Sequence, residues 1–160
     1  FRTILMFESR LEKRNISLVG LDSDPISVWG DPDLIGQVIY NLFENAVKFV
    51  NTGGTITFTF TDEPNSTCIA IRNTGAGISK EELPKIFERF YKSDDSRSHD
   101  KTGLGIGLDI TKHIVRLHKA QISVSSEEGE YTEFLIRLPK QETPEESHAD
   151  DTEEKPKGTI

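Results

Sequence analysis

The sequence predicts a single α+β domain, in which antiparallel strands are combined with amphipathic helices. Residues 55–61 alternate apolar side chains with threonines, which is the period-two pattern of a half-buried strand. A turn follows, and the apolar run 67–72 then returns as the antiparallel partner. Residues 32–50 and 103–118 instead carry apolar side chains at helical spacing. A chain of 160 residues is long enough for one such core and too short for two.

The first third of the chain predicts a helix, two short strands and a long helix. Residues 1–14 have apolar positions at helical spacing, so we expect the end of a helix that enters the domain. Strands are expected at 16–19 and 26–29. The Asp-Pro-Asp at 31–33 supplies an N-cap, a proline at the first helical position and an acid in the first turn. The long helix is therefore predicted to run from 32 to about 50.

Two further segments lie between the hairpin and the last helix. Ser79, followed three residues later by Glu82, forms a capping box, which predicts a short helix over 79–90. Residues 92–102 contain almost no hydrophobic side chain, so we expect this segment to be mobile.

The end of the chain predicts two strands and a tail. Strands are expected at 121–125 and 132–138, joined by a turn at Gly129. The last residues are acidic, contain proline and lack aromatic side chains, which is typical of disorder. We therefore divide the chain into the end of a preceding helix or linker at 1–15, a folded domain at 16–140 and a disordered acidic tail at 141–160.

Composition excludes several classes of protein. The formal charge of −8, without a dense basic block, argues against a nucleic-acid partner. Cys68 is the single cysteine, so the chain has no internal disulfide. No apolar run is long enough to span a bilayer. Since the chain begins at Phe1 and not at a methionine, we expect it to be a fragment of a longer protein.

The long helix carries a polar stripe. Asn41, Asn45 and Lys48 fall on one side of it, and apolar residues occupy the other side. Amide oxygens are ligands that suit Mg²⁺, and a lysine beside them suits a phosphate. A solvated polar stripe would have the same spacing, and that alternative stays open on this helix alone.

Two glycine clusters could place backbone close to a ligand. Gly75 and Gly77 directly follow a strand, where the absence of Cβ permits unusual φ values. Gly103, Gly105 and Gly107 lead into the N-terminus of a helix, whose N–H groups favour phosphate oxygens. The spacing is neither that of a P-loop nor that of a Rossmann turn. A structural turn also explains either cluster alone.

Taken in order, these stretches resemble the ATP-binding catalytic domain of bacterial sensor histidine kinases, which belongs to the GHKL superfamily of ATPases and kinases. The likeness covers roughly residues 18–139 and rests on five stretches: NLFENAVK, NTGAGI, FERFY, GLGIGL and GEYTEFLIRLP. It implies a two-layer α/β sandwich, with three main helices on one face of a mixed, mostly antiparallel sheet of about five strands. A flexible lid would cover the ATP.

The resemblance implies roles for the polar stripe. Asn41 and Asn45 would present oxygens to Mg²⁺, and Lys48 would pair with phosphate oxygens, so these three are the expected catalytic residues. In hydrolysing relatives such as gyrase, the position that matches Asn41 carries a glutamate that acts as general base. An amide cannot do this, which favours transfer of the γ-phosphoryl group over hydrolysis.

The resemblance also implies an adenine pocket. Asn73 stands where the family usually has an aspartate that accepts a hydrogen bond from the adenine amino group, and an amide oxygen can still accept it. Thr132 would support the adenine through water, although an exposed strand threonine is an alternative. Ile78 and Leu108 are expected pocket walls or core residues. The remaining expected nucleotide contacts are Gly75, Gly77, Lys92, Arg97, Gly103, Leu104, Gly105, Ile106 and Gly107.

The implied function is transfer of the γ-phosphoryl group of ATP to a histidine on a dimerisation and phosphoacceptor domain. None of the four histidines lies in the family's acceptor motif, so we expect the fragment not to phosphorylate itself; they are His99, His113, His118 and His148. The implied partners are that acceptor domain and a response-regulator receiver domain. The full-length protein is expected to be a homodimer on the cytoplasmic side, anchored in the bacterial membrane.

Two rival functions remain at this point. One is an ATP-hydrolysing relative of the gyrase, chaperone or mismatch-repair kind, or an anti-sigma serine kinase of similar fold. The other is a module that binds partners without turning over ATP, and Asn73 is the residue that motivates it.

Overall fold

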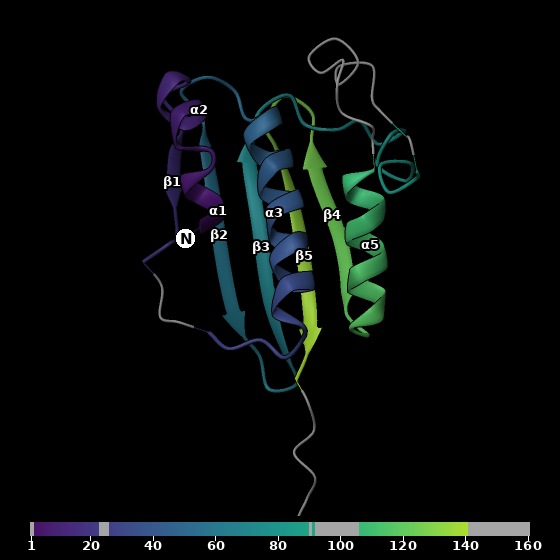
Figure 1. The fold of residues 1–160 in the computed structure, drawn as a ribbon. Coiled ribbons are helices and arrows are strands. Elements are labelled where there is room, and N and C mark those ends of the chain that lie inside the picture. Colours follow the sequence, from purple (N-terminus) through teal and green to yellow (C-terminus); the bar gives the residue numbers. More distant parts are fainter. Residues whose placement is uncertain (1, 23–25, 90, 92–105, 141–160) are drawn as a thin grey trace, which may run out of the picture.

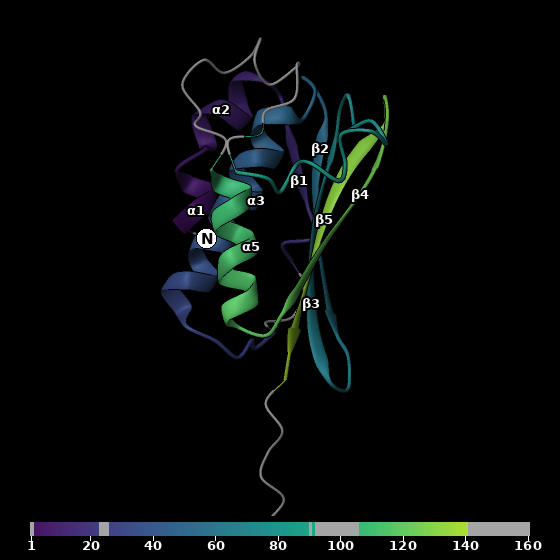
Figure 2. The same ribbon diagram turned by 90° about the vertical axis from the view of Figure 1, so that its right-hand side faces the viewer.

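The computed structural model describes residues 2–22, 26–89, 91 and 106–140. In this part of the chain a five-stranded sheet forms one layer, and helices on one of its faces form the other (Figures 1 and 2). The predicted α+β sandwich is thus confirmed. The segment 92–102, predicted to be mobile, and the predicted tail at 141–160 lie outside the described residues.

The sheet is mixed and mostly antiparallel. Its strand order is β1-β2-β3-β5-β4, with β1 parallel to β2 and every other pair antiparallel. The strands are β1 (Ser17–Val19), β2 (Thr55–Asp62), β3 (Ser66–Thr74), β4 (Gln121–Glu127) and β5 (Tyr131–Pro139). The helices are α1 (Arg2–Leu5), α2 (Glu8–Lys13), α3 (Pro32–Phe49) and α5 (Gly107–Leu117). None of the helices in the described ranges has the length and apolar character that crossing a membrane requires.

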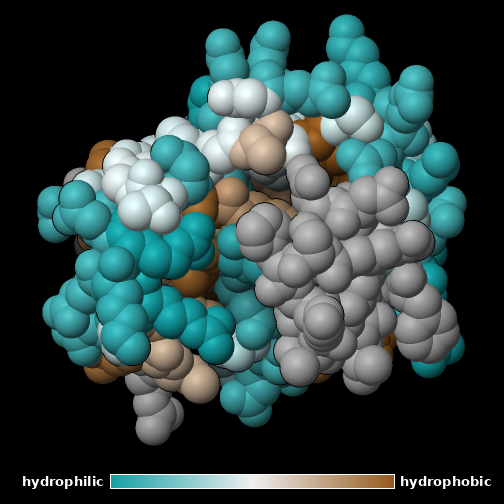
Figure 3. All heavy atoms as spheres, turned by 90° about the horizontal axis from the view of Figure 1, so that it is seen from above, coloured by the Kyte–Doolittle hydropathy of each residue, from teal (hydrophilic) through white to brown (hydrophobic). Residues whose placement is uncertain are grey.

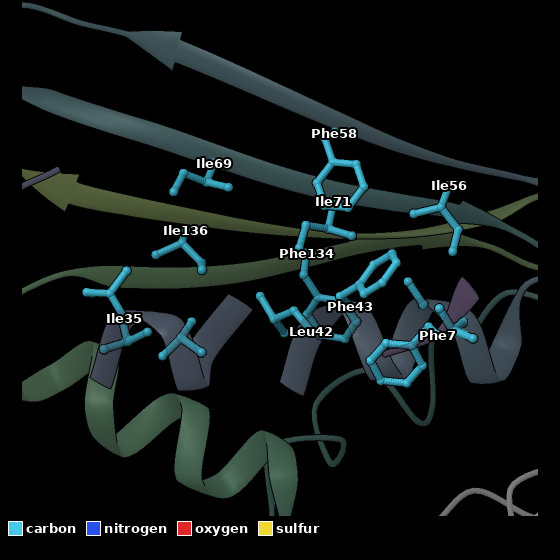
Figure 4. Packing of buried hydrophobic residues seen from close by; sticks show 14 of the residues in the cluster. Phe7, Ile35, Leu42, Phe43, Ile56, Phe58, Ile69, Ile71, Phe134 and Ile136 are labelled. Atoms are coloured by element: carbon cyan, nitrogen blue, oxygen red, sulfur yellow. The ribbon is translucent and has the colours of Figure 1, made fainter. Parts of the chain in front are cut away.

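The core lies between α3 and the sheet. Ile71 of β3 stands opposite Phe58 of β2 and Phe134 of β5, so the three side chains share one face. Leu42 and Phe43 of α3 point toward them (Figure 4) and are at most 1% exposed. Burial of each such side chain contributes about 1.5–3 kcal/mol. This packing fixes how α3 presents its other side.

The start of α3 agrees with the prediction. The Asp31 carboxylate accepts hydrogen bonds from the N–H groups of Asp33 at 2.9 Å and Leu34 at 3.0 Å, and Pro32 occupies the first turn. These bonds satisfy two of the N–H groups that a helix start leaves without partners.

The strand predicted at 26–29 was wrong. This segment has no strand pairing, although Ile26 and Val28 are half-buried and alternate with exposed Ser27 and Trp29. Val28 packs against the core without joining a ladder. An alternation of apolar and polar residues shows only that one side of an extended segment is buried. A β-strand also needs a neighbouring strand with which its backbone can form hydrogen bonds.

The short helix predicted at 79–90 was also wrong. The described part of this segment is a series of turns. The Leu83 N–H bonds a residue four positions earlier, Ser79 O at 3.1 Å, and other bonds reach three positions back, such as Lys85 N–H to Glu82 O at 2.8 Å. The capping pair forms, with Ser79 Oγ donating to Glu82 at 3.0 Å. Pro84 explains the outcome, because proline lacks an N–H group and disfavours helical backbone at the residue before it.

The opening helix is divided into α1 and α2. After the end of α1, the Phe7 N–H donates a hydrogen bond to Ile4 O at 2.9 Å, three residues earlier. Its ring turns inward against Phe43, with centroids 5.3 Å apart, and against Tyr40 at 5.6 Å. The gain from burying this ring explains the break in the helix.

Candidate nucleotide-binding site

The predicted site residues that the structure describes meet at one end of the molecule. There α3 and β3 end and α5 and β5 begin, at the top of Figure 1. Figure 3 looks onto this end, where the surface has a hollow beside polar side chains. Hydrophobic residues are visible inside this hollow. Segments that are far apart in the sequence therefore form one surface.

Asn41 lies in the seam between α3 and α5. Its Nδ2 donates to Gly107 O at 3.1 Å and to Thr111 Oγ1 at 3.2 Å, and its Oδ1 accepts from Gln37 Nε2 at 2.8 Å. The side chain is only 9% exposed. Asn41 is therefore not part of a solvated stripe: it ties the first turn of α5 to α3.

Asn45 and Lys48 follow on α3 toward this end, and both are half-buried. The Asn45 side chain makes no hydrogen bond to another described residue, so its amide oxygen can accept a ligand. Lys48 Nζ lies 5.0 Å from the centre of the Phe49 ring. Asn45 and Lys48 are three residues apart, so they lie on the same side of the last two turns of α3.

Asn73 and Thr132 stand opposite each other on β3 and β5. They are 2% and 5% exposed, and they continue the core-facing side of the sheet to its end. Asn73 Nδ2 donates to Thr74 O at 3.1 Å. This bond orients the amide and leaves Oδ1 as an acceptor for a ligand N–H.

Ser126 is a site residue that the sequence analysis missed. It stands opposite Thr132 on β4, and its Oγ donates to Tyr131 O at 2.5 Å. The same oxygen accepts the Ile78 N–H at 2.8 Å and lies 3.0 Å from Thr132 Oγ1. Since the Ser126 proton is used, Thr132 donates to Ser126 and keeps its own lone pairs for a ligand or a water molecule. Ser126 therefore joins the first glycine loop to Thr132 and, through the strand pairing, to the row that contains Asn73.

The loop that contains Gly75 and Gly77 is tightly packed. Gly77 has φ +72°, and a Cβ there would collide with Glu127 O. Gly75 has φ +150°, and a Cβ there would collide with Phe49 O at the end of α3. Both glycines are required by close backbone approach, so the structural reason for them holds whether or not a ligand binds.

The second glycine stretch is described from Ile106 onward. Ile106 occupies the N-cap position of α5, but its side chain makes no capping hydrogen bond. Gly107 is the first residue of this helix and is exposed. Leu108 and Ile78 are half-buried and pack against the core, in agreement with the core alternative for both. The predicted contacts Lys92, Arg97, Gly103, Leu104 and Gly105 lie outside the described residues.

The amide oxygen of Asn45 is a ligand of the kind that suits Mg²⁺. The described residues contain no cluster of three or more His, Cys, Asp or Glu side chains that could hold a metal ion. Cys68 also takes no part in the site. It is buried within β3, and this burial raises the pKa of its thiol.

Cavities elsewhere in the fold do not contain the predicted site residues. One of about 490 Å³ lies over β4 and β5, and an apolar one of about 260 Å³ lies between α1, α3 and the sheet. The candidate site is therefore identified by its chemistry and not by the volume of a cavity.

Similarity to known proteins decides the family. Residues 30–142 match the family described as histidine kinase-, DNA gyrase B- and HSP90-like ATPase. The chain belongs to this family of ATPases. The sensor protein SrrB of Staphylococcus aureus is 41% identical to this ATPase domain over 116 residues, which are 72% of the chain and 20% of SrrB. The chain thus spans about a fifth of the length of the curated relatives it matches.

Solved structures agree with this assignment. The catalytic domain of the histidine kinase ThkA superposes on the ATPase domain with a TM-score of 0.73 and 27% identity, over 86% of this chain and 88% of ThkA's. The mycobacterial sensor histidine kinase MprB gives 0.72 and 28%, over 86% and 92%. The fold is therefore that of histidine kinase catalytic domains, and the family resemblance is confirmed.

Proposed function

We propose that this domain binds ATP with Mg²⁺ and transfers the γ-phosphoryl group to a histidine on a separate dimerisation and phosphoacceptor domain. The phosphoryl group would then pass to an aspartate on the receiver domain of a response regulator. The family, which is one of ATPases, and the relatives, which are named as sensor proteins and histidine kinases, support this proposal.

The observation that carries the proposal is the meeting of three motifs at one end of the molecule. Asn41 touches the first turn of α5, and the end of α3 lies against the loop at Gly75. The same loop is bonded to Ser126 beside Thr132. A nucleotide at this end would reach all of these groups.

The adenine end is assigned to Asn73. Its Oδ1 would accept a hydrogen bond from the adenine amino group, while the Nδ2 bond to Thr74 O holds the amide in that orientation. Guanine has a carbonyl oxygen at the corresponding position, which would face the same acceptor. This geometry therefore favours ATP over GTP.

The phosphate end is assigned to Asn45, Lys48 and the N-terminus of α5. The amide oxygen of Asn45 would hold the cation and Lys48 would neutralise phosphate oxygens, while the backbone N–H groups of α5 would add hydrogen bonds. When bound, Mg²⁺ would supply further neutralisation of the phosphate charge. Catalysis by these residues is mainly positioning and charge stabilisation.

Transfer is favoured over hydrolysis by Asn41. Its amide cannot take a proton from water, and its oxygen already accepts the Gln37 hydrogen bond at 2.8 Å. A water molecule would find no general base at this residue.

The experiment mixes the domain, labelled ATP and a separately prepared acceptor-helix dimer, and measures label on histidine. We expect label with the parent domain and a loss of at least about a hundredfold in rate with Asn45→Ala, because a ligand of the cation is removed. Asn65→Ala is the matched control, since Asn65 is an exposed residue of the β2–β3 turn at the opposite end.

Absence of label with the parent would contradict the proposal. Rapid steady-state phosphate release would then favour the hydrolysing rival. No heat with a non-hydrolysable ATP analogue and Mg²⁺ would favour the module that only binds partners.

We also propose that residues 16–140 are the catalytic domain of a homodimeric sensor protein on the cytoplasmic side of a bacterial membrane, to which other segments anchor it. Residues 1–15 would be the end of the preceding helix or linker. Phe7 and Leu11 pack in the same core as α3, so this linker would be fastened to the domain.

A further inference from the structure

The C-terminal end of α3 lacks a common cap. The last turn of a helix leaves carbonyl groups without partners in the helix, and a glycine just after the helix often satisfies them. Here Val50 is extended, with φ −61° and ψ 139°, and its N–H bonds Ala46 O. The Asn51 N–H, which would bond Val47 O in a longer helix, instead goes to Thr74 O at 3.3 Å. The Val47 carbonyl therefore needs another donor.

Arg14 supplies that donor. Its Nη1 donates to Val47 O at 2.6 Å, and its Nη2 donates to Val50 O. Its own carbonyl accepts the Gly53 N–H at 2.8 Å. The guanidinium group is part-buried and places a positive charge at the negative end of the helix dipole. Arg14, which directly follows α2, thus forms hydrogen bonds both with the end of α3 and with the turn that follows α3.

The two carbonyl groups that Arg14 binds lie on either side of Lys48 and Phe49 in the sequence. Phe49 O in turn lies against Gly75, and Val50 forms a bridge with the same glycine. The position of this helix end therefore determines where the Lys48 side chain starts. It also determines how α3 contacts the loop that contains Gly75.

We propose that Arg14 is a positioning residue for the triphosphate, which acts through Lys48. This inference rests on the proposed function, because it assigns Lys48 to the phosphates. The planar guanidinium group reaches two carbonyl oxygens at once, which a lysine cannot do. Loss of Arg14 releases the last turn of α3, so that Lys48 spends less time where the phosphates bind.

The test is the affinity for a non-hydrolysable ATP analogue with Mg²⁺, measured by calorimetry. Arg14→Ala is expected to weaken binding roughly tenfold, which is within the range for a lost charge-assisted hydrogen bond. Arg14→Lys keeps the charge and one bond, and is expected to fall between Arg14→Ala and the parent. Lys13→Ala is the matched control, since Lys13 is exposed on α2, and it should bind like the parent.

A double-mutant cycle separates positioning from general destabilisation. If Arg14 acts through Lys48, then Arg14→Ala should change the affinity less than about twofold when Lys48→Ala is already present. An undiminished tenfold effect in that background would overturn the inference, and so would parent-like affinity of both Arg14 variants. If Arg14→Ala does not fold, the same cycle is run with Arg14→Lys.

The outcomes also distinguish this inference from the proposed function. A parent domain that does not bind the analogue removes both. A different outcome removes only the role of Arg14: the parent binds the analogue, Lys48→Ala weakens this binding, and the Arg14 variants bind like the parent.

Discussion

At the scale of single residues, Ser126 links the first glycine loop to β5, because its Oγ accepts the Ile78 N–H at 2.8 Å and lies 3.0 Å from Thr132 Oγ1. The spacing of Asn45 and Lys48 places them on one polar stripe of the long helix, and the family resemblance points to Asn73. Ser126 does not stand out in a strand rich in serine. The signal that could have found it is the alternation Ile122, Val124, Ser126, which places its hydroxyl on the core-facing side.

The role of Ser126 leads to a stability prediction. Ser126→Ala leaves the Ile78 N–H and the Thr132 hydroxyl without their acceptor, so the free energy of unfolding should fall by about 1–3 kcal/mol. Denaturant unfolding measures this loss. Ser125→Ala is the control, because Ser125 is exposed on the other side of the same strand, and its effect should be within about 0.5 kcal/mol of zero. Equal effects of the two substitutions would remove the structural role given to Ser126.

At the scale of elements, the prediction succeeded where a local signal agreed with the packing. The Asp-Pro-Asp start of α3 and the period-two strand β2 are such cases. The failures have physical causes that pattern alone does not show. Residues 26–29 alternate in burial without a pairing partner, and Pro84 converts a capped segment into turns. The described part of the second glycine stretch did begin a helix as predicted.

The two glycine stretches should differ in their tolerance of a side chain. Gly77→Ala puts a methyl group into the Glu127 carbonyl at φ +72°, so it should destabilise the domain by at least about 1–3 kcal/mol. Gly107→Ala meets nothing closer than Asn41 Cγ at 3.9 Å, and it should keep or raise the stability. Thermal unfolding of both variants is the measurement. A Gly77→Ala variant as stable as the parent would show that the loop can move away from β4.

At the scale of the whole molecule, the overall architecture follows from the sequence. The apolar faces of α3 and of the strands are removed from water only when they pack on each other. Figure 4 shows this contact, and it brings segments from Phe7 to Ile136 into one core. The site could be predicted only in part. The neighbouring residues Asn73, Thr132 and Ser126 of the candidate site lie on three strands whose order, β3-β5-β4, is not contained in any local pattern. The link from Arg14 to the end of α3 spans 33 and 36 residues and was equally invisible.

The most direct measurement of the central claim is a crystal structure of this domain with a non-hydrolysable ATP analogue and Mg²⁺. The account predicts the adenine amino group within hydrogen-bond distance of Asn73 Oδ1, and the phosphates between Asn45, Lys48 and the start of α5. A nucleotide bound at another surface, or with its phosphates away from the end of α3, would contradict it.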